Sequence, residues 1–215
     1  MSYTDQNTFF AQAYRTGTDH WTNIPFNRRP NELTLYLPKD ALILDLGTGR
    51  GRLLYELADL DFRSIGLENN LDMVHRGNSE IKNKKLEREM RFIHGDALDI
   101  PLTDGSFDAV VDIGLLHHIK PEDYETYVSE AARVLKVGGL AYIVLLSKLS
   151  PNYFSWHPNK DEQSDYVREG VRYHFFSDEE LYGLFGKKFE IMQLDHDMPY
   201  GPRDMVFSVL LLKKK

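Results

Sequence analysis

The chain has 215 residues, and its 26 lysines and arginines face 33 aspartates and glutamates, a formal charge of −7. This length suits one elaborated domain. The chain has no cysteine, which excludes disulfide frameworks, thiolate metal sites and a cysteine nucleophile. The acidic balance argues against a nucleic-acid partner. With no secretory signal and no apolar run near the roughly 20 residues of a membrane-spanning helix, we expect a cytoplasmic protein with no membrane partner.

The front of the chain predicts two short helices, over residues 4–15 and 30–36. Short apolar runs follow, and helical periodicity separates them. Because these runs are nearly continuous in apolar character, they are typical of parallel strands covered on both faces. The clearest helix between them runs over 121–136 and is closed by Gly138 and Gly139. The five predicted strands are residues 41–45, 64–67, 91–94, 107–112 and 140–146.

The alternation of strand and helix predicts an α/β fold with an open parallel sheet. The alternation of strand and helix ends at residue 146, and residues 147–172 are predicted to form an irregular, aromatic-rich segment. Ser177 and Glu180 then form a capping box that opens a short helix. Two strands at 189–194 and 205–212 close the chain as a hairpin, with Pro199, Gly201 and Pro202 in its turn.

We therefore expect a single domain over residues 1–215. Its predicted parts are an N-terminal cap (1–38), a core (39–146), an insertion after the fifth strand (147–176), and a C-terminal helix and hairpin (177–215).

A glycine-rich turn follows the first predicted strand, in the sequence LDLGTGRGR at 44–52. Glycines there let the backbone approach a ligand closely, and the next helix offers free N–H groups. Alone, this pattern could be only a tight turn. Glu68, at the end of the second strand, could accept hydrogen bonds from ribose hydroxyls, and Asp96, after the third, could accept from an adenine amine. These sites meet at the switch point of a doubly wound sheet, which predicts a nucleotide site.

The spacing is G-x-G-x-G, since Arg52 stands where a dinucleotide fingerprint needs its third glycine. Four blocks in order, LDLGTGRGRLLYELA, GLENN, GDALDIPLTDGSFDAVVDIGLLHHI and RVLKVGGLAYIVLL, resemble the class I S-adenosylmethionine-dependent methyltransferases, in the broad small-molecule (type 11-like) group. The resemblance implies a Rossmann-like doubly wound sheet of seven strands in the order 3-2-1-4-5-7-6, with strand 7 antiparallel. It also implies S-adenosylmethionine as the cofactor.

The family pattern assigns roles to the residues that match it. Asp45 and the glycines would hold the methionine part, Glu68 the ribose, and Asp96 the adenine amine. Asp112 and its neighbours would line the methyl region, and Thr48 stands where relatives often have cysteine or serine. The cofactor residues implied are Asp45, Gly47, Thr48, Gly49, Gly51, Glu68, Asn69, Asp96, Ala97, Asp112, Ile113 and Gly114.

The methyl acceptor should lie against the N-terminal cap and the insertion. His117 is the candidate general base, because imidazole can take a proton near neutrality; the alternative is that the histidine pair is architectural and His118 only packs. No metal site is expected, since adjacent histidines point apart. Aromatic and basic side chains would suit an aromatic or carboxylate-bearing molecule, unless they only seal the cap. The predicted acceptor residues are Tyr14, Arg15, Trp21, Arg28 and Trp156.

The sequence thus predicts a methyltransferase that acts on a small-molecule acceptor by in-line displacement, as a monomer or homodimer. Three alternatives stay open: an RNA acceptor, a protein acceptor, and a catalytically silent module that only binds S-adenosylmethionine.

Overall fold

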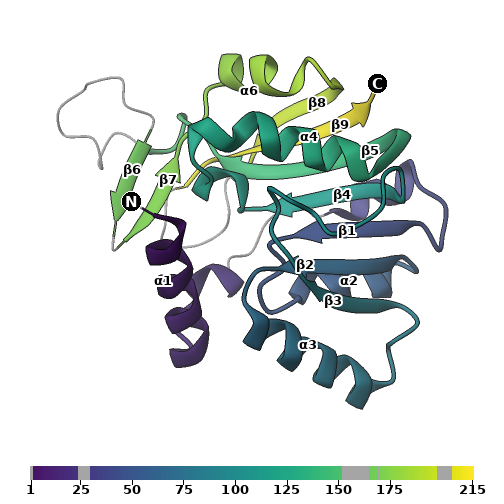
Figure 1. The fold of residues 1–215 in the computed structure, drawn as a ribbon. Coiled ribbons are helices and arrows are strands. Elements are labelled where there is room, and N and C mark those ends of the chain that lie inside the picture. The colour runs from purple at the N-terminus through teal and green to yellow at the C-terminus, as the bar shows by residue number, and fades with distance from the viewer. Residues whose placement is uncertain (1, 24–29, 152–164, 169, 198–204) are drawn as a thin grey trace.

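A seven-stranded sheet forms the centre of the computed structural model, which describes residues 2–23, 30–151, 165–168, 170–197 and 205–215 (Figure 1). The strand order is β3-β2-β1-β4-β5-β9-β8. The first five are parallel, whereas β9 runs antiparallel to both β5 and β8. The predicted order with an antiparallel last strand is confirmed. The strands are β1 (Leu42–Leu46), β2 (Arg63–Glu68), β3 (Met90–His94), β4 (Phe107–Ile113), β5 (Leu135–Leu146), β8 (Phe189–Asp197) and β9 (Phe207–Lys214).

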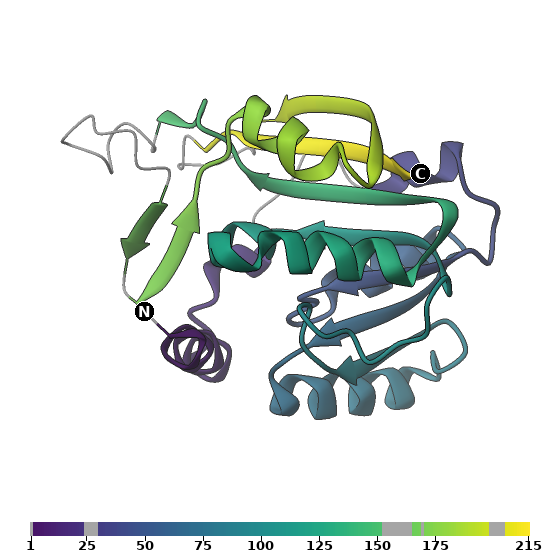
Figure 2. The ribbon, with the colours of Figure 1, turned by 45° about the horizontal axis from the view of Figure 1, so that its top comes forward.

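Helices cover both faces of the sheet (Figures 1 and 2). On one face, α4 (Tyr124–Val134) and α6 (Asp178–Phe185) pack on a core that includes Leu44. On the other, α2 (Arg52–Asp59) and the 3-10 helix η2 (Pro30–Leu35) pack on a core that includes Ile43. A third cluster joins α3 (Leu71–Lys84) to β3. Neighbouring strand residues are therefore buried on opposite faces, which explains the continuous apolar runs.

The helix predicted over 121–136 ends earlier than its sequence indicates. A 3-10 turn, η4 (Pro121–Asp123), leads into α4, and β5 begins at Leu135, before the two glycines. Leu135 pairs with Phe107, and a register shift follows before Ala109 pairs with Leu140. The glycines therefore lie in this irregular part of the strand, where Gly138 has a φ of 74°. The predicted helix end was wrong because Leu135 is already extended and paired with Phe107.

The first helix of the chain and the described part of the insertion lie together at one end of the sheet. Helix α1 (Tyr3–Thr16) confirms the first predicted helix and has a complete capping box, while the second is the 3-10 helix η2. The segment predicted to be irregular contains a hairpin of β6 (Asp165–Arg168) and β7 (Val171–His174). Figure 1 shows α1 and this hairpin beside the carboxyl ends of the parallel strands.

Two further predictions concern the end of the chain. The capping box of α6 is present in both directions, between Ser177 and Glu180. The hairpin turn with Pro199, Gly201 and Pro202 lies outside the described residues. None of the helices in the described part of the chain has both the length and the apolar character needed to cross a membrane.

Candidate functional site

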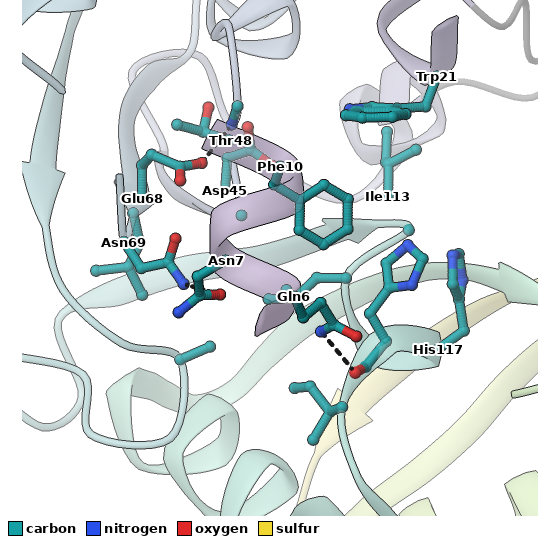
Figure 3. Close-up of a pocket in the computed structure, with 18 of the residues that line it drawn as sticks. Gln6, Asn7, Phe10, Trp21, Asp45, Thr48, Glu68, Asn69, Ile113 and His117 are labelled. Atoms are coloured by element: carbon teal, nitrogen blue, oxygen red, sulfur yellow. Dashed lines mark hydrogen bonds between the residues drawn. The ribbon is translucent and has the colours of Figure 1, made fainter. Parts of the chain in front are cut away.

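A pocket of about 300 Å³ opens where the parallel strands end, under α1. This volume is at the lower end of the range for small-ligand sites. Figure 3 shows Asp45, Thr48, Glu68 and Asn69 on one side of α1, and Trp21, Ile113 and His117 on the other. We call the first side the polar half of the pocket, and the turns at the ends of β1, β2 and β3 line it. We call the second side the aromatic half. It is lined by residues at and after the end of β4, together with Leu146, Tyr173, Met205 and Phe207.

The glycine turn after β1 forms the base of the polar half. Gly47 and Gly49 have φ angles of 69° and 55°. The amides of Gly47 and Thr48 both donate to the carbonyl of Leu67, which ties the turn to β2. A Cβ on Gly49 would lie 2.7 Å from the hydroxyl of Tyr14, so only glycine lets α1 close over this turn.

Glu68 is nearly fully buried and joins the glycine turn to the end of β2. One carboxylate oxygen accepts from the amide of Gly49 at 2.8 Å, and the other accepts from the amide of Asn70 at 2.9 Å. Burial raises the pKa of Glu68, although these hydrogen bonds oppose the rise. Asn69, next to it, donates to the side chain of Asn7 on α1 at 3.2 Å. Glu68 therefore both lines the pocket and holds its backbone in place.

Asp45 is a second buried acid in the polar half. Its burial raises its pKa to about 8, and the carboxylates of Asp112 and Glu68 add to the rise. A carboxyl group of this kind is stabilised as an anion when a cation comes close. Across the polar half, Asp96 accepts from the amide of Leu98, and Ala97 lies beside it in the lining. The polar half thus offers acids to a ligand with hydroxyl and ammonium groups.

The aromatic half is walled by rings that meet edge to face. Phe10 contacts Trp21 at 5.3 Å between ring centroids and His118 at 5.2 Å. His118 in turn contacts Tyr173 at 4.9 Å. Ile113 and Gly114, at the end of β4, lie in the same lining. These rings come from α1, from the 3-10 helix η1 (His20–Asn23), from η3 (Leu116–His118) and from β7, so this wall is assembled from distant parts of the chain.

The two histidines of η3 differ in their surroundings. His117 is buried, and burial lowers its pKa well below the usual value; its Nδ1 has no hydrogen-bond partner among the described residues. His118 is only partly buried, and its Nδ1 lies 2.6 Å from the carbonyl oxygen of Arg172. Burial lowers the pKa of His118 to about 4, although that hydrogen bond opposes the shift. Both rings are therefore neutral at neutral pH.

Three of the predicted site residues do not line the pocket. Asp112 is fully buried and accepts hydrogen bonds from Tyr127 and from the amides of Leu115 and Leu116. Its carboxylate therefore stabilises the start of η3 and does not face the pocket. Gly51 caps α2, where a Cβ would meet the ring of Phe92 at 2.2 Å.

Arg15 is the third, and it is exposed on α1. The other predicted acceptor residues divide into two groups. Tyr14 and Trp21 line the pocket, whereas Arg28 and Trp156 lie outside the described residues. Every other predicted cofactor residue lines the pocket.

The sequence reasoning missed the rest of the α1 surface. Tyr3, Gln6, Asn7 and Phe10 line the pocket together with Tyr14. Their spacing of three or four residues is that of one helical stripe. A stripe that mixes aromatic and amide side chains on a helix beside the glycine turn was the available signal.

Comparison with known proteins agrees with this geometry. The family model described as a methyltransferase domain matches residues 43–139, from β1 to the glycines of β5. Ajmaline N-methyltransferase of Rauvolfia serpentina is 32% identical over 57% of this chain and 43% of its own length. The tRNA (carboxymethyluridine(34)-5-O)-methyltransferase alkbh8 of Xenopus tropicalis is 31% identical over 62% of this chain and 19% of its own. The chain therefore spans less than half the length of these two relatives.

Among solved structures, the fold is similar to that of the 1,6-didemethyltoxoflavin-N1-methyltransferase of Burkholderia thailandensis. The TM-score is 0.81 at 22% identity, over 99% of this chain and 88% of the other, so this likeness concerns the fold. The family match lies on the strands and turns that build the polar half, and the sheet order is the one that the sequence resemblance implied. The chain therefore matches a methyltransferase domain over residues 43–139 and has the fold of a solved methyltransferase.

Proposed function

We propose that this chain transfers a methyl group from S-adenosylmethionine to a small-molecule acceptor. The observation that carries the proposal is that one pocket joins an acid-lined glycine turn to an open aromatic wall. In-line displacement at a methyl group needs little from the protein besides close placement of the two reactants, and placement accounts for much of the rate.

The residues of the polar half fit the cofactor. Asp45 is a buried acid whose anion an ammonium group would stabilise. Glu68 lies at the end of β2, where its carboxylate would accept hydrogen bonds from the ribose hydroxyls. Gly47 and Gly49 leave the turn without side chains that would fill the space. When bound, the cofactor supplies a methyl group on a positively charged sulfur, already activated for displacement. Ile113 and Gly114, at the end of β4 in the aromatic half, would border that methyl group.

An RNA acceptor is the second candidate, and one finding favours it. A relative that matches 62% of this chain is named as a tRNA methyltransferase. Against it, RNA binding depends largely on lysines and arginines that contact phosphates, and the chain carries a formal charge of −7. The aromatic half under α1 also suits a small acceptor, because the pocket has a volume of only about 300 Å³.

A methyl-release assay separates these candidates. The chain would be incubated with labelled S-adenosylmethionine and, separately, with small metabolites, total RNA and unfolded protein. We expect label in the small-molecule fraction, and loss of it in Asp45→Asn but not in Asp59→Asn, which changes an exposed acid on α2. Label in RNA alone would overturn the small-molecule assignment. Cofactor binding with no labelled fraction would overturn transfer and leave a silent binding module.

A further inference from the structure

One hydrogen bond fixes the tautomer of the His118 ring. A carbonyl oxygen only accepts hydrogen bonds, so at 2.6 Å from the carbonyl of Arg172 the Nδ1 atom of His118 must carry the hydrogen. In the neutral ring the other nitrogen, Nε2, is then an acceptor with a free lone pair. The pocket lining thus includes an imidazole whose remaining nitrogen can accept a proton.

Gln6 makes hydrogen bonds to the backbone of both His118 and Arg172. Its side-chain N–H donates to the carbonyl of His118 at 3.0 Å, and its side-chain oxygen accepts from the amide of Arg172 at 3.1 Å. Gln6 is 7% exposed, so these bonds are shielded from water. One α1 side chain therefore fixes η3 and β7 at the same place, as an orienting group does for a general base. Figure 3 shows Gln6 pointing from α1 to the backbone beneath the imidazoles.

Resting on the methyl transfer proposed above, we propose that His118 accepts the proton from an N–H or O–H group of a neutral aromatic acceptor, and that Gln6 is the positioning residue for that imidazole. The lone pair of the acceptor nitrogen or oxygen forms the new bond to the methyl carbon, and the sulfur–carbon bond breaks with its electron pair left on sulfur. The proton of the acceptor passes to Nε2 of His118. The resulting imidazolium keeps its Nδ1–H bond to Arg172 and later loses a proton to water.

The walls of the aromatic half indicate an aromatic acceptor. Phe10 and Tyr173 contact His118 edge to face, and Trp21 contacts Phe10 in the same way, so the wall offers edges and faces to a planar ring. Such contacts contribute about 0.5–1.5 kcal/mol beyond the area they bury.

The charges in the lining indicate a neutral acceptor. Arg50 makes two hydrogen bonds to Asp19, at 2.6 and 2.7 Å. Arg52 donates to the carbonyl of Thr22 at 2.6 Å and pairs with Glu56 at 3.3 Å. Both guanidinium groups of the described lining are thus engaged, and a carboxylate would have to displace one of their partners. A cation would be repelled by the sulfonium that it must approach.

A set of matched probes tests this assignment by calorimetry on the full chain loaded with an unreactive analogue of S-adenosylmethionine that keeps a positive charge at the sulfur position. Indole has an N–H, benzofuran is nearly the same shape without one, indole-2-carboxylate is an anion and tryptamine is a cation. We expect indole to bind about three to ten times more tightly than benzofuran, as one hydrogen bond allows. We expect both charged probes to bind at least about tenfold more weakly than indole. Preference for either charged probe, or equal binding of indole and benzofuran, would overturn the proposal.

Variants then assign the hydrogen bond to one ring. His118→Phe keeps an aromatic ring but removes Nε2, so we expect the indole-to-benzofuran ratio to fall to about one. We expect Gln6→Leu to lower this ratio and Gln12→Leu, on the exposed side of α1, to leave it unchanged. If the ratio falls in His117→Phe and persists in His118→Phe, the proton acceptor is His117 and the proposal fails. Binding of S-adenosylhomocysteine itself, measured first, shows separately whether the proposed function fails.

The tautomer gives a readout that needs no acceptor. In ¹⁵N-histidine spectra, identified by the signal lost in His118→Phe, we expect His118 to be neutral from pH 6 to 8 and protonated on Nδ1. A signal for the tautomer protonated on Nε2, or for an imidazolium at pH 7, would contradict the proposed role.

Discussion

Asp45 is an acid that the fold keeps neutral until a cation arrives. Its pKa is about 8 in the folded protein, because burial disfavours the anion, and near 4 in the unfolded chain. Between these values the folded protein keeps a proton that the unfolded chain has lost. The contribution of Asp45 to the free energy of unfolding is therefore fully present below pH 4 and is lost as the pH rises towards 8.

Asp45→Asn tests this at the level of one carboxyl group. Asparagine cannot ionise, so we expect the variant to melt at a higher temperature than the unmodified protein at pH 8. The difference in the free energy of unfolding should be about 5 kcal/mol, or roughly 10–20 °C for a domain of this size. At pH 4.5 the difference should nearly vanish. Scanning calorimetry without cofactor measures this difference. If the advantage of the variant over the unmodified protein is smaller at pH 8 than at pH 4.5, Asp45 is ionised in the folded protein.

Glu68→Ala should separate the binding role of this acid from its structural one. We expect cofactor affinity to fall by about 1–3 kcal/mol, since the ribose hydroxyls lose their partner. We also expect a lower melting temperature, because the amides of Gly49 and Asn70 lose an acceptor. Calorimetric titration measures the first effect. An unchanged dissociation constant in a folded variant would mean that the ribose lies elsewhere.

Gly51 shows why a motif residue can be structural. Its φ of 74° and its closeness to Phe92 both exclude a side chain. We expect Gly51→Ala to lower the free energy of unfolding by about 1–3 kcal/mol more than Gly105→Ala does. Gly105 is a matched control because its φ is also positive but open space surrounds it. Urea unfolding measures the difference, and Phe92→Leu should restore part of it. Equal losses at the two glycines would mean that the ring of Phe92 moves aside freely.

At the scale of elements, α1 is held to the site by side chains that reach backbone groups. Gln6→Leu leaves the carbonyl of His118 and the amide of Arg172 unpaired, which we expect to cost about 1–3 kcal/mol. Hydrogen exchange should then be faster in α1 than in the Gln12→Leu control, while the amides of β1 and β4 stay protected. Equal exchange in the two variants would show that other contacts hold α1.

The elements that the sequence predicted best are those with short-range signals. Strands β1 and β4, the helix α1 and the capping box of α6 depend on local periodicity and local hydrogen bonds. The hairpin of β6 and β7 escaped prediction because its strands are four residues long and only partly buried. The end of α4 was misplaced because the pairing of Leu135 with Phe107, which is distant in sequence, overrides local helix preference.

The candidate site divides in the same way. Asp45, Glu68 and Asp96 could be placed because each lies at or just beyond the carboxyl end of a strand, and these ends meet at one edge of a parallel sheet. Asp112 also ends a strand, but it faces Tyr127 and the backbone of η3, and nothing in its local sequence distinguishes the two cases. The bond between His118 and Arg172 joins residues 54 positions apart, so no spacing rule could reveal it.

On the scale of the whole molecule, the sheet, its two helical layers and α1 serve one purpose. They bring acids from the ends of β1 and β2 and rings from α1, η3 and β7 around a common space. The central claim is that the polar half holds the methyl donor of a methyltransferase.

Calorimetric titration of the full chain with S-adenosylhomocysteine tests that claim most directly. We expect one site per chain, with binding weakened in Glu68→Ala and unchanged in the exposed Asp59→Asn control. The absence of binding in the folded, unmodified chain, or a site that takes a nicotinamide dinucleotide in preference, would contradict it.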